Sequence, residues 1–328
     1  MSVGVDGEAR APWIGLNDQP VELLELHLSY RCPNHCRFCS EAERMGAFRQ
    51  YPVSWGMVAT VLRRHAERGV TKLHLTGGEP TIHPRLIEAL TMGRKLGMAT
   101  SVSTNGVMLS REPFARLAVP LLDDCMFSLH GPKPAIHERL TGRPGSFEQA
   151  VGAMRTVLSV NPEFAIHVNI VVTQHNVDTL GETVKLAGEL GASLIVVSNV
   201  SPEGNGAKAY GDLAVPLSRL QEVLPTLPPQ APGSIIRFFA VPMCILGDHA
   251  MLSNDLYWDP RVTVEWGNEP GKVVYGEVYS WQPARKRVHV AECMGCLQQN
   301  VCMGVFEQYR VDHPADLELL RPLKREGK

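Results

Sequence analysis

Three cysteines stand close together in the segment RCPNHCRFCS, at Cys32, Cys36 and Cys39. This C-x3-C-x2-C spacing offers three thiolates, whereas a structural zinc site takes four ligands and usually draws them from two C-x2-C pairs. A 4Fe–4S cluster also takes four ligands, one for each iron. Three cysteines would leave one iron open, and an open iron can bind a substrate or a cofactor. The spacing therefore favours an iron–sulfur centre with an open position over a zinc site.

A second set of cysteines lies toward the C-terminus. Cys293, Cys296 and Cys302 form a C-x2-C-x5-C pattern, and Cys244 stands well before them. Four thiolates would fully ligate one 4Fe–4S cluster, with a structural zinc on the same four ligands as the alternative. Cys244 could instead be a free thiol that donates a hydrogen atom. Cys125 belongs to neither set, and its apolar neighbours predict a buried core thiol.

Composition describes an ordinary globular chain of 328 residues, with 44% hydrophobic and 20% charged residues. The formal net charge of −2 favours neither nucleic acid nor an acidic membrane surface as a partner. The N-terminal segment lacks the apolar stretch of a secretory signal, and no apolar run reaches the length of a membrane span. We therefore expect a cytoplasmic protein whose thiols stay reduced.

The elements that position these cysteines alternate along the chain. From about residue 21, strand-like and helix-like segments follow one another, as six βα units would require. Six such units imply a parallel sheet with right-handed crossovers, either open or closed into part of a barrel. Strands are expected at 21–30, 72–78, 99–106, 123–131, 164–176 and 192–202, with helices at 54–69, 83–97, 146–160 and 180–191.

Polar residues recur on one face of these strands. Because side chains alternate between faces, Glu25, His27 and Ser29 share one face of the first strand while leucines occupy the other. A parallel sheet covered on both sides should be apolar on both faces. The pattern predicts a partial (β/α)6 TIM-like barrel whose interior holds a polar ligand. The later strands repeat it in His74 and Thr76; Ser101, Ser103 and Asn105; Ser128 and His130; His167 and Asn169.

The alternation stops near residue 230, at the proline-rich segment LPTLPPQAPGS. Beyond it come short strand-like pieces and the second cysteine set. We expect an N-terminal extension at 1–20, the partial barrel at 21–230, and a smaller C-terminal α+β domain at 231–328.

Four segments resemble the radical SAM (S-adenosylmethionine) superfamily. CPNHCRFC is similar to its C-x3-C-x-aromatic-C motif, with Phe38 in the aromatic slot. TGGEP (76–80) resembles the GGEP segment at the end of the second strand, and STNG (103–106) and SLHG (128–131) end the third and fourth strands. The resemblance covers roughly residues 21–230.

The C-terminal cysteines resemble the core of the auxiliary-cluster domain called SPASM, whose pattern continues with x3-C. Phe306 occupies that next position, so the full pattern for two auxiliary clusters is absent. The shorter twitch domain holds one cluster. This resemblance favours a 4Fe–4S cluster over zinc for the second cysteine set.

The resemblance implies roles for residues around the first cysteine set. SAM would bind the open iron through its amino and carboxylate groups. Gly77 and Gly78 would let the backbone approach its methionine part. Glu79 is a candidate partner for the SAM ammonium, with a strand-end surface acid as the alternative.

Further contacts follow from matching positions on the later strands. A core histidine satisfied by backbone is the alternative for His130. The expected set is Phe38 beside adenine, Asn105 and Ser128 near the ribose, and His130, Asn169 and Ser198 in contact with SAM or substrate.

The expected activity is reductive cleavage of SAM to a 5′-deoxyadenosyl radical, which takes a hydrogen atom from the substrate. Oxidation or rearrangement at a C–H site of a small metabolite or peptide would follow, with an electron donor such as flavodoxin or ferredoxin. The short segment before the first strand favours a small metabolite or sugar, unless a separate protein recognises a leader peptide. Alternatives are an epimerase that uses Cys244 as hydrogen-atom donor, and a non-catalytic iron–sulfur scaffold or sensor.

Overall fold

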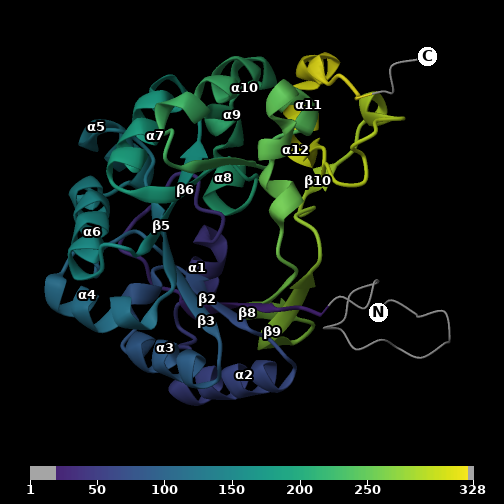
Figure 1. Ribbon diagram of the computed structural model, residues 1–328. Coiled ribbons are helices and arrows are strands. Elements are labelled where there is room, and N and C mark those ends of the chain that lie inside the picture. The colour runs from purple at the N-terminus through teal and green to yellow at the C-terminus, as the bar shows by residue number, and fades with distance from the viewer. Residues whose placement is uncertain (1–19, 324–328) are drawn as a thin grey trace.

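The computed structural model describes residues 20–323, and its centre is a nine-stranded sheet in the order β7-β6-β5-β4-β3-β2-β1-β8-β9 (Figure 1). Neighbouring strands from β7 through to β8 run parallel, and only the β8–β9 pair is antiparallel. The first six strands confirm those expected from the sequence. The bounds are β1 (Leu23–Ser29), β2 (Lys72–Gly77), β3 (Ala99–Thr104), β4 (Asp124–Ser128), β5 (Ala165–Val172), β6 (Ala192–Asn199), β7 (Ile235–Phe239), β8 (Arg261–Glu269) and β9 (Lys272–Ser280).

Helices cover the outer side of this curved sheet (Figure 1). In the longest of them, Phe147, Ala150, Met154 and Val157 recur at helical spacing and are buried against the sheet. The four helices expected from the sequence are confirmed as α2 (Trp55–Glu67), α3 (Leu86–Lys95), α6 (Ser146–Val160) and α7 (Leu180–Glu189). The others are α1 (Ala42–Phe48), α4 (Glu112–Ala118), α5 (Pro134–Thr141), α8 (Gly204–Lys208), α9 (Tyr210–Leu213), α10 (Leu217–Val223), α11 (Met243–Leu246) and α12 (Glu307–Asp312).

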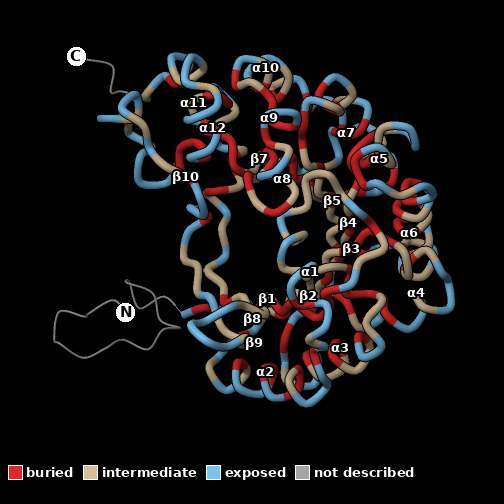
Figure 2. The backbone as a smooth tube through the Cα atoms, turned by 180° about the vertical axis from the view of Figure 1, so that it is seen from behind, coloured by how far each residue is buried: buried red, intermediate tan, exposed pale blue. Residues whose placement is uncertain are grey.

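The core lies between the outer face of the sheet and these helices, where buried residues concentrate (Figure 2). Leu24, Leu26 and Leu28 are fully buried on that face of β1. Cys125 is fully buried in the same core, as its neighbours predicted. The apolar face of the strands therefore packs against the helices, as the alternation of residues predicted.

The chain beyond residue 230 extends the same sheet. The sequence assigned its strand-like pieces to a separate domain, but β7 pairs with β6, and β8 pairs with β1 at the opposite edge. An uncovered parallel edge exposes unpaired backbone N–H and C=O groups, and these strands satisfy them. The boundary near residue 230 itself stays a prediction. The remaining C-terminal strands, β10 (Arg287–Val288) and β11 (Val305–Phe306), form a separate antiparallel pair.

No helix in the part of the chain that the structure describes is both long enough and apolar enough to cross a membrane.

Candidate functional site

The polar inner faces of the strands border a cavity of about 850 Å³. The sequence placed polar side chains on this face, and most of them do line the cavity. The inner-face residues that line it are Glu25, His74, Thr76, Ser101, Ser103, Asn105, Ser128, His130, Asn169 and Ser198.

The first cysteine set lines the same cavity from the loop after β1. Cys32, Cys36 and Cys39 are half-buried free thiols. Asn205 at the start of α8 holds the loop, because its amide nitrogen Nδ2 donates to the carbonyl of Cys36 at 3.0 Å. Its backbone N–H donates to the carbonyl of Cys39 at 2.9 Å. These bonds to a distant helix fix where the thiols point.

The electrostatics of the three thiols suit a metal cluster. Burial raises the pKa of Cys32 to about 11, and it also raises the pKa values of Cys36 and Cys39. Neighbouring thiols add to the shift at Cys36, because thiolates close together repel. Bound iron supplies the positive charge that lets buried thiols ionise. Three thiols on one loop, facing a cavity with room for a further ligand, therefore fit a 4Fe–4S cluster with an open iron.

Gly77 and Gly78 lie where two backbone segments approach closely. Gly77 has a φ of +111°, and a Cβ there would lie 2.5 Å from the carbonyl oxygen of Ser29. A Cβ on Gly78 would lie 2.9 Å from the carbonyl carbon of Arg31 and closer still to its oxygen. Both positions therefore require glycine, and the turn packs against the residue that precedes Cys32. Whether the turn also contacts SAM stays a prediction.

Glu79 is not a surface acid, because only 1% of it is exposed. Its carboxylate accepts hydrogen bonds from the N–H and hydroxyl of Thr81, at 3.1 and 2.5 Å. It also accepts from the Thr104 hydroxyl at 2.8 Å and from the Asn105 N–H at 2.7 Å. Burial raises its pKa, and these hydrogen bonds oppose the rise. Glu79 thus ties the end of β3 to the turn after β2.

Asn105 uses its side chain beside the cysteine loop. Its Nδ2 donates to the sulfur of Cys32 at 3.6 Å, and its Oδ1 accepts from the N–H of Val107 at 3.1 Å. The sequence did not indicate the contact with sulfur, since it joins residues from two separate βα units.

His130 and Phe38 pack together at the cavity wall, with ring centroids 4.7 Å apart. The N–H of Val171 donates to Nδ1 of His130 at 3.2 Å, so the backbone does satisfy one ring nitrogen. Burial, with His137 stacked alongside, holds the pKa of His130 well below its usual range. His130 is therefore a neutral histidine that carries its proton on Nε2.

The remaining predicted contacts also lie on the cavity wall. The Ser198 hydroxyl donates to Oδ1 of Asn169 at 2.6 Å, so these two side chains act as one polar unit. Ser128 lines the same wall at the end of β4. The structure therefore brings every residue predicted for the first site to one cavity.

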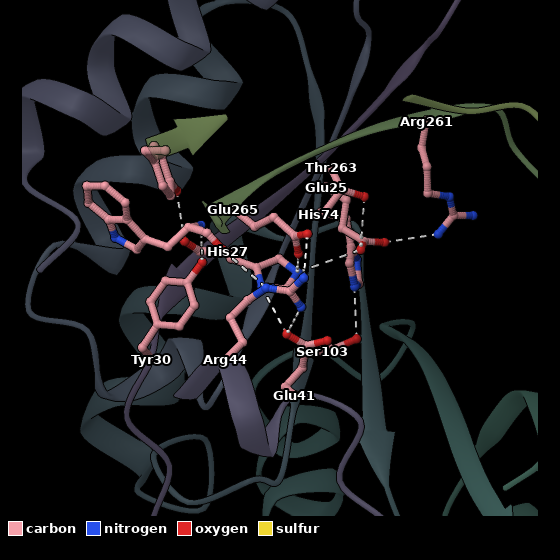
Figure 3. Close-up of polar contacts among 12 residues, drawn as sticks. Glu25, His27, Tyr30, Glu41, Arg44, His74, Ser103, Arg261, Thr263 and Glu265 are labelled. Atoms are coloured by element: carbon pink, nitrogen blue, oxygen red, sulfur yellow. Dashed lines mark hydrogen bonds and ion pairs between the residues drawn. The ribbon is translucent and has the colours of Figure 1, made fainter. Parts of the chain in front are cut away.

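The sequence did not indicate a charged network that lies beside the cysteine loop. Arg44 donates to Glu41 at 2.8 Å and to Glu265 at 2.7 Å, and so joins α1 to β8. Figure 3 shows His27 between these two carboxylates, 3.5 Å from Glu41 and 3.6 Å from Glu265. Glu41 stands two positions after Cys39, so the network ties the end of the cysteine loop to β8. The sequence indicated only that His27 lies on the polar face of β1.

A second polar group lines the cavity nearer the N-terminal ends of the strands. Glu25 pairs with Arg261 of β8 at 3.0 Å. The two nitrogens of His74 lie 2.7 Å from the hydroxyl of Ser101 and 2.8 Å from that of Ser103 (Figure 3 shows the contact with Ser103). Burial lowers the pKa of His74 to about 4, so it is neutral here.

The second cysteine set also converges. Cys244 on α11 lines a small cavity together with Cys293, Cys296 and Cys302. Burial raises the pKa of Cys244 to about 11, and the nearby thiols of Cys302 and Cys293 add to the rise. The sulfur of Cys302 accepts from the N–H of Gly304 at 3.4 Å. Four thiols around one cavity fit a fully ligated cluster, and Cys244 is not among the residues that line the large cavity.

The fold and the two sites define a mostly parallel α/β protein with three clustered thiols at one end of its sheet. The model of the Radical SAM superfamily matches residues 26–187. Over this segment, which is just under half of the chain, the protein is similar to the radical SAM superfamily.

Its curated relatives include PqqA peptide cyclases. Those of Gluconobacter oxydans (strain 621H) and Rhodopseudomonas palustris (strain ATCC BAA-98 / CGA009) are each 31% identical to it, over 210 and 211 residues. Each match covers 63% of this chain, but only 57% and 54% of the respective relatives. The chain thus matches little more than half the length of these relatives.

Solved structures share the fold at low sequence identity. SuiB of Streptococcus suis bound to S-adenosylmethionine aligns with a TM-score of 0.60 and 14% identity, over 93% of this chain and 76% of SuiB. The structure of anSMEcpe with bound AdoMet and the Cp18Cys peptide aligns with a TM-score of 0.62 and 13% identity, over 90% of this chain and 96% of that protein. At such identities the likeness concerns the fold alone.

Proposed function

We propose that this protein is a radical SAM enzyme that modifies a C–H site of a peptide. One observation carries the proposal: the three thiols of C-x3-C-x2-C, the Gly77–Gly78 turn and the polar strand faces border one cavity. When bound, a 4Fe–4S cluster and SAM supply a 5′-deoxyadenosyl radical that takes a hydrogen atom from the substrate. Cys32, Cys36 and Cys39 would hold three irons of that cluster.

The other roles belong to side chains that orient and enclose the ligands. Phe38 offers an apolar face for adenine, and Ser128 offers a hydroxyl for the ribose. Asn169 and Ser198 hold each other in place and present polar atoms to SAM or substrate. Glu79 acts through the backbone it holds, because its carboxylate oxygens are already engaged.

The second cysteine set would hold an auxiliary 4Fe–4S cluster in a twitch-like region. Its four thiols around one cavity support full ligation by Cys244, Cys293, Cys296 and Cys302. A fully ligated cluster suits the removal of a second electron from a substrate radical, and so favours oxidation or cross-linking. An electron donor such as flavodoxin or ferredoxin, and the reducing cytoplasm, belong to the same proposal.

A peptide substrate is favoured over a small metabolite. The supporting observation is the match to two PqqA peptide cyclases over 63% of this chain. This proposal replaces the sequence-based expectation of a small metabolite or sugar.

The test is reductive cleavage of SAM by anaerobically reconstituted protein with dithionite. The wild type should hold about eight irons and release 5′-deoxyadenosine and methionine. The triple variant Cys32→Ala, Cys36→Ala, Cys39→Ala should hold about four irons and release neither product. Cys125→Ala is the matched control, because this thiol is buried in the core and lines neither cavity, and it should behave as the wild type. Equal turnover by the triple variant would refute the proposal.

Epimerisation is the second candidate, with Cys244 as the hydrogen-atom donor and only three thiols on the second cluster. A donor thiol must reach the substrate, whereas Cys244 borders the smaller cavity with the other three cysteines. A non-catalytic scaffold is the third candidate, and SAM cleavage by the reduced protein would exclude it.

A further inference from the structure

The amide of Asn105 has a fixed orientation toward the sulfur of Cys32. The N–H of Val107 can only donate a hydrogen bond, so the side-chain atom 3.1 Å away must be the oxygen Oδ1. The other end of the amide is then the donor Nδ2, which lies 3.6 Å from the Cys32 sulfur. That separation is ordinary for N–H···S, because sulfur is larger than oxygen.

A second anchor holds the backbone of the same residue. The N–H of Asn105 donates to Oε2 of Glu79 at 2.7 Å. Oε1 of Glu79 meanwhile accepts from both donors of Thr81 and from the hydroxyl of Thr104. Asn105 is only 8% exposed, and both its backbone and its side chain are hydrogen-bonded. These hydrogen bonds therefore hold the side-chain amide in the orientation that points toward the sulfur of Cys32.

Asn105 differs from the other donors around this loop. The backbone N–H of Asn34 also counters the rise in the pKa of Cys32, and those of Glu41 and Ala42 counter the rise in the pKa of Cys39. All of these groups lie in the loop or at the start of α1, which follows it. Among residues 20–323, Asn105 is the one side chain that donates to a sulfur of this loop, and it comes from a different strand.

We propose that Asn105 is a positioning residue that raises the reduction potential of the cluster held by Cys32, Cys36 and Cys39. The inference rests on the proposed function, because it requires a cluster on these thiols. A cluster that gains one electron carries more negative charge on its sulfur ligands. A hydrogen bond to a ligand sulfur therefore stabilises the reduced state more than the oxidised state.

The experiment is an anaerobic redox titration of the reconstituted full-length protein with dithionite, followed by electron paramagnetic resonance. SAM is added only to a separate sample, to identify the cluster with the open iron, and the midpoint potentials of all variants are compared without SAM. Asn105→Ser is the principal variant: its hydroxyl can still accept from the N–H of Val107 but is too short to reach Cys32. Asn105→Ala removes both contacts. Asn169→Ala is the matched control, because Asn169 lines the same cavity and bonds to Ser198 instead.

Both Asn105 variants should have a more negative midpoint potential than the wild type. At the wild-type midpoint, their ratio of reduced to oxidised cluster should fall several-fold, while Asn169→Ala keeps the wild-type ratio. Unchanged ratios in both Asn105 variants, or an equal fall in Asn169→Ala, would overturn the inference while leaving the proposed function intact.

Iron content measured on the same samples separates tuning from assembly. If Asn105→Ser and Asn105→Ala load no cluster at this site, Asn105→Gln, which keeps an amide donor, should restore loading. Failure of all three to load would overturn the tuning role. A wild-type protein without a cluster on these three thiols would instead overturn the proposed function.

Discussion

Replacing Gly78 with alanine should disrupt the approach of the turn after β2 to the cysteine loop. The added Cβ would lie 2.9 Å from the carbonyl carbon and 3.2 Å from the amide nitrogen of Arg31, the residue before Cys32. Gly78 has no positive φ, so the effect of the substitution is steric. All of these neighbouring atoms belong to the backbone of Arg31, so there is no flexible side chain that could move aside.

The contacts at this position set how much stability Gly78→Ala loses. Crowding one methyl group into close-packed structure costs about 1–3 kcal/mol. The N–H of Gly78 donates to Ser29 at 2.6 Å, and that of Glu79 donates to Arg31 at 2.8 Å. Weakening one of these bonds adds about 1 kcal/mol. We therefore expect Gly78→Ala to lower the free energy of unfolding by roughly 2–4 kcal/mol, and Tm by roughly 3–8 °C.

The assay is anaerobic thermal unfolding, with iron content and SAM affinity measured on the same samples. Because the turn abuts the cysteine loop, SAM binding should weaken together with stability. Gly46→Ala in α1 is the matched control: its Cβ would meet no atom within 4 Å. It should raise stability by up to about 1 kcal/mol, since alanine is the better helix former. Wild-type melting and SAM affinity in Gly78→Ala would refute the reasoning.

Two further predictions concern a thiol and a carboxyl. Cys244→Ala should lose the second cluster and keep about four of eight irons, and it should also weaken folding of the region around that cluster, because metal binding contributes to its folding. Full iron content with SAM cleavage but no product would instead favour Cys244 as the hydrogen-atom donor. Asp124→Asn should remove a pH dependence of stability, since burial raises the pKa of Asp124 from 3.8 to about 6. A raised acid pKa stabilises the fold below about pH 4, and this contribution is lost as the pH rises through about 6. Because Asp124 is partly exposed, we reduce the effect and expect Asp124→Asn to be more stable than the wild type by about 1–2 kcal/mol at pH 7 and equal to it near pH 4. Denaturant titrations across this pH range measure the difference, and a constant difference at every pH would contradict the prediction.

Much of the barrel could be predicted because its signals are local. Strand and helix periods depend on neighbours within a few positions, and six strands and four helices were found this way. The same alternation indicated which face of each strand borders the cavity. His27 marks the limit of this reasoning, because its polar face was right but it meets the carboxylates of Glu41 and Glu265 rather than lining the cavity.

Glu79 shows why single residues resist prediction. Its place at a strand end indicated either a surface acid or a partner for a ligand ammonium. Its four hydrogen-bond donors lie on Thr81, Thr104 and Asn105, and two of these residues belong to the next βα unit. Nothing in the local pattern specifies which loop ends meet across neighbouring strands.

The sequence by itself determined that three thiols lie on one short loop, because C-x3-C-x2-C places them there whatever surrounds them. It also determined the alternating strands and helices, which follow from steric and hydrophobic preferences of near neighbours. Tertiary structure alone decided that β7 and β8 cover the sheet edges, that Cys244 joins the later cysteines, and that Asn105 reaches Cys32. These are contacts between distant segments, and they form only when the burial of the whole core outweighs the entropy of closing the loops between them.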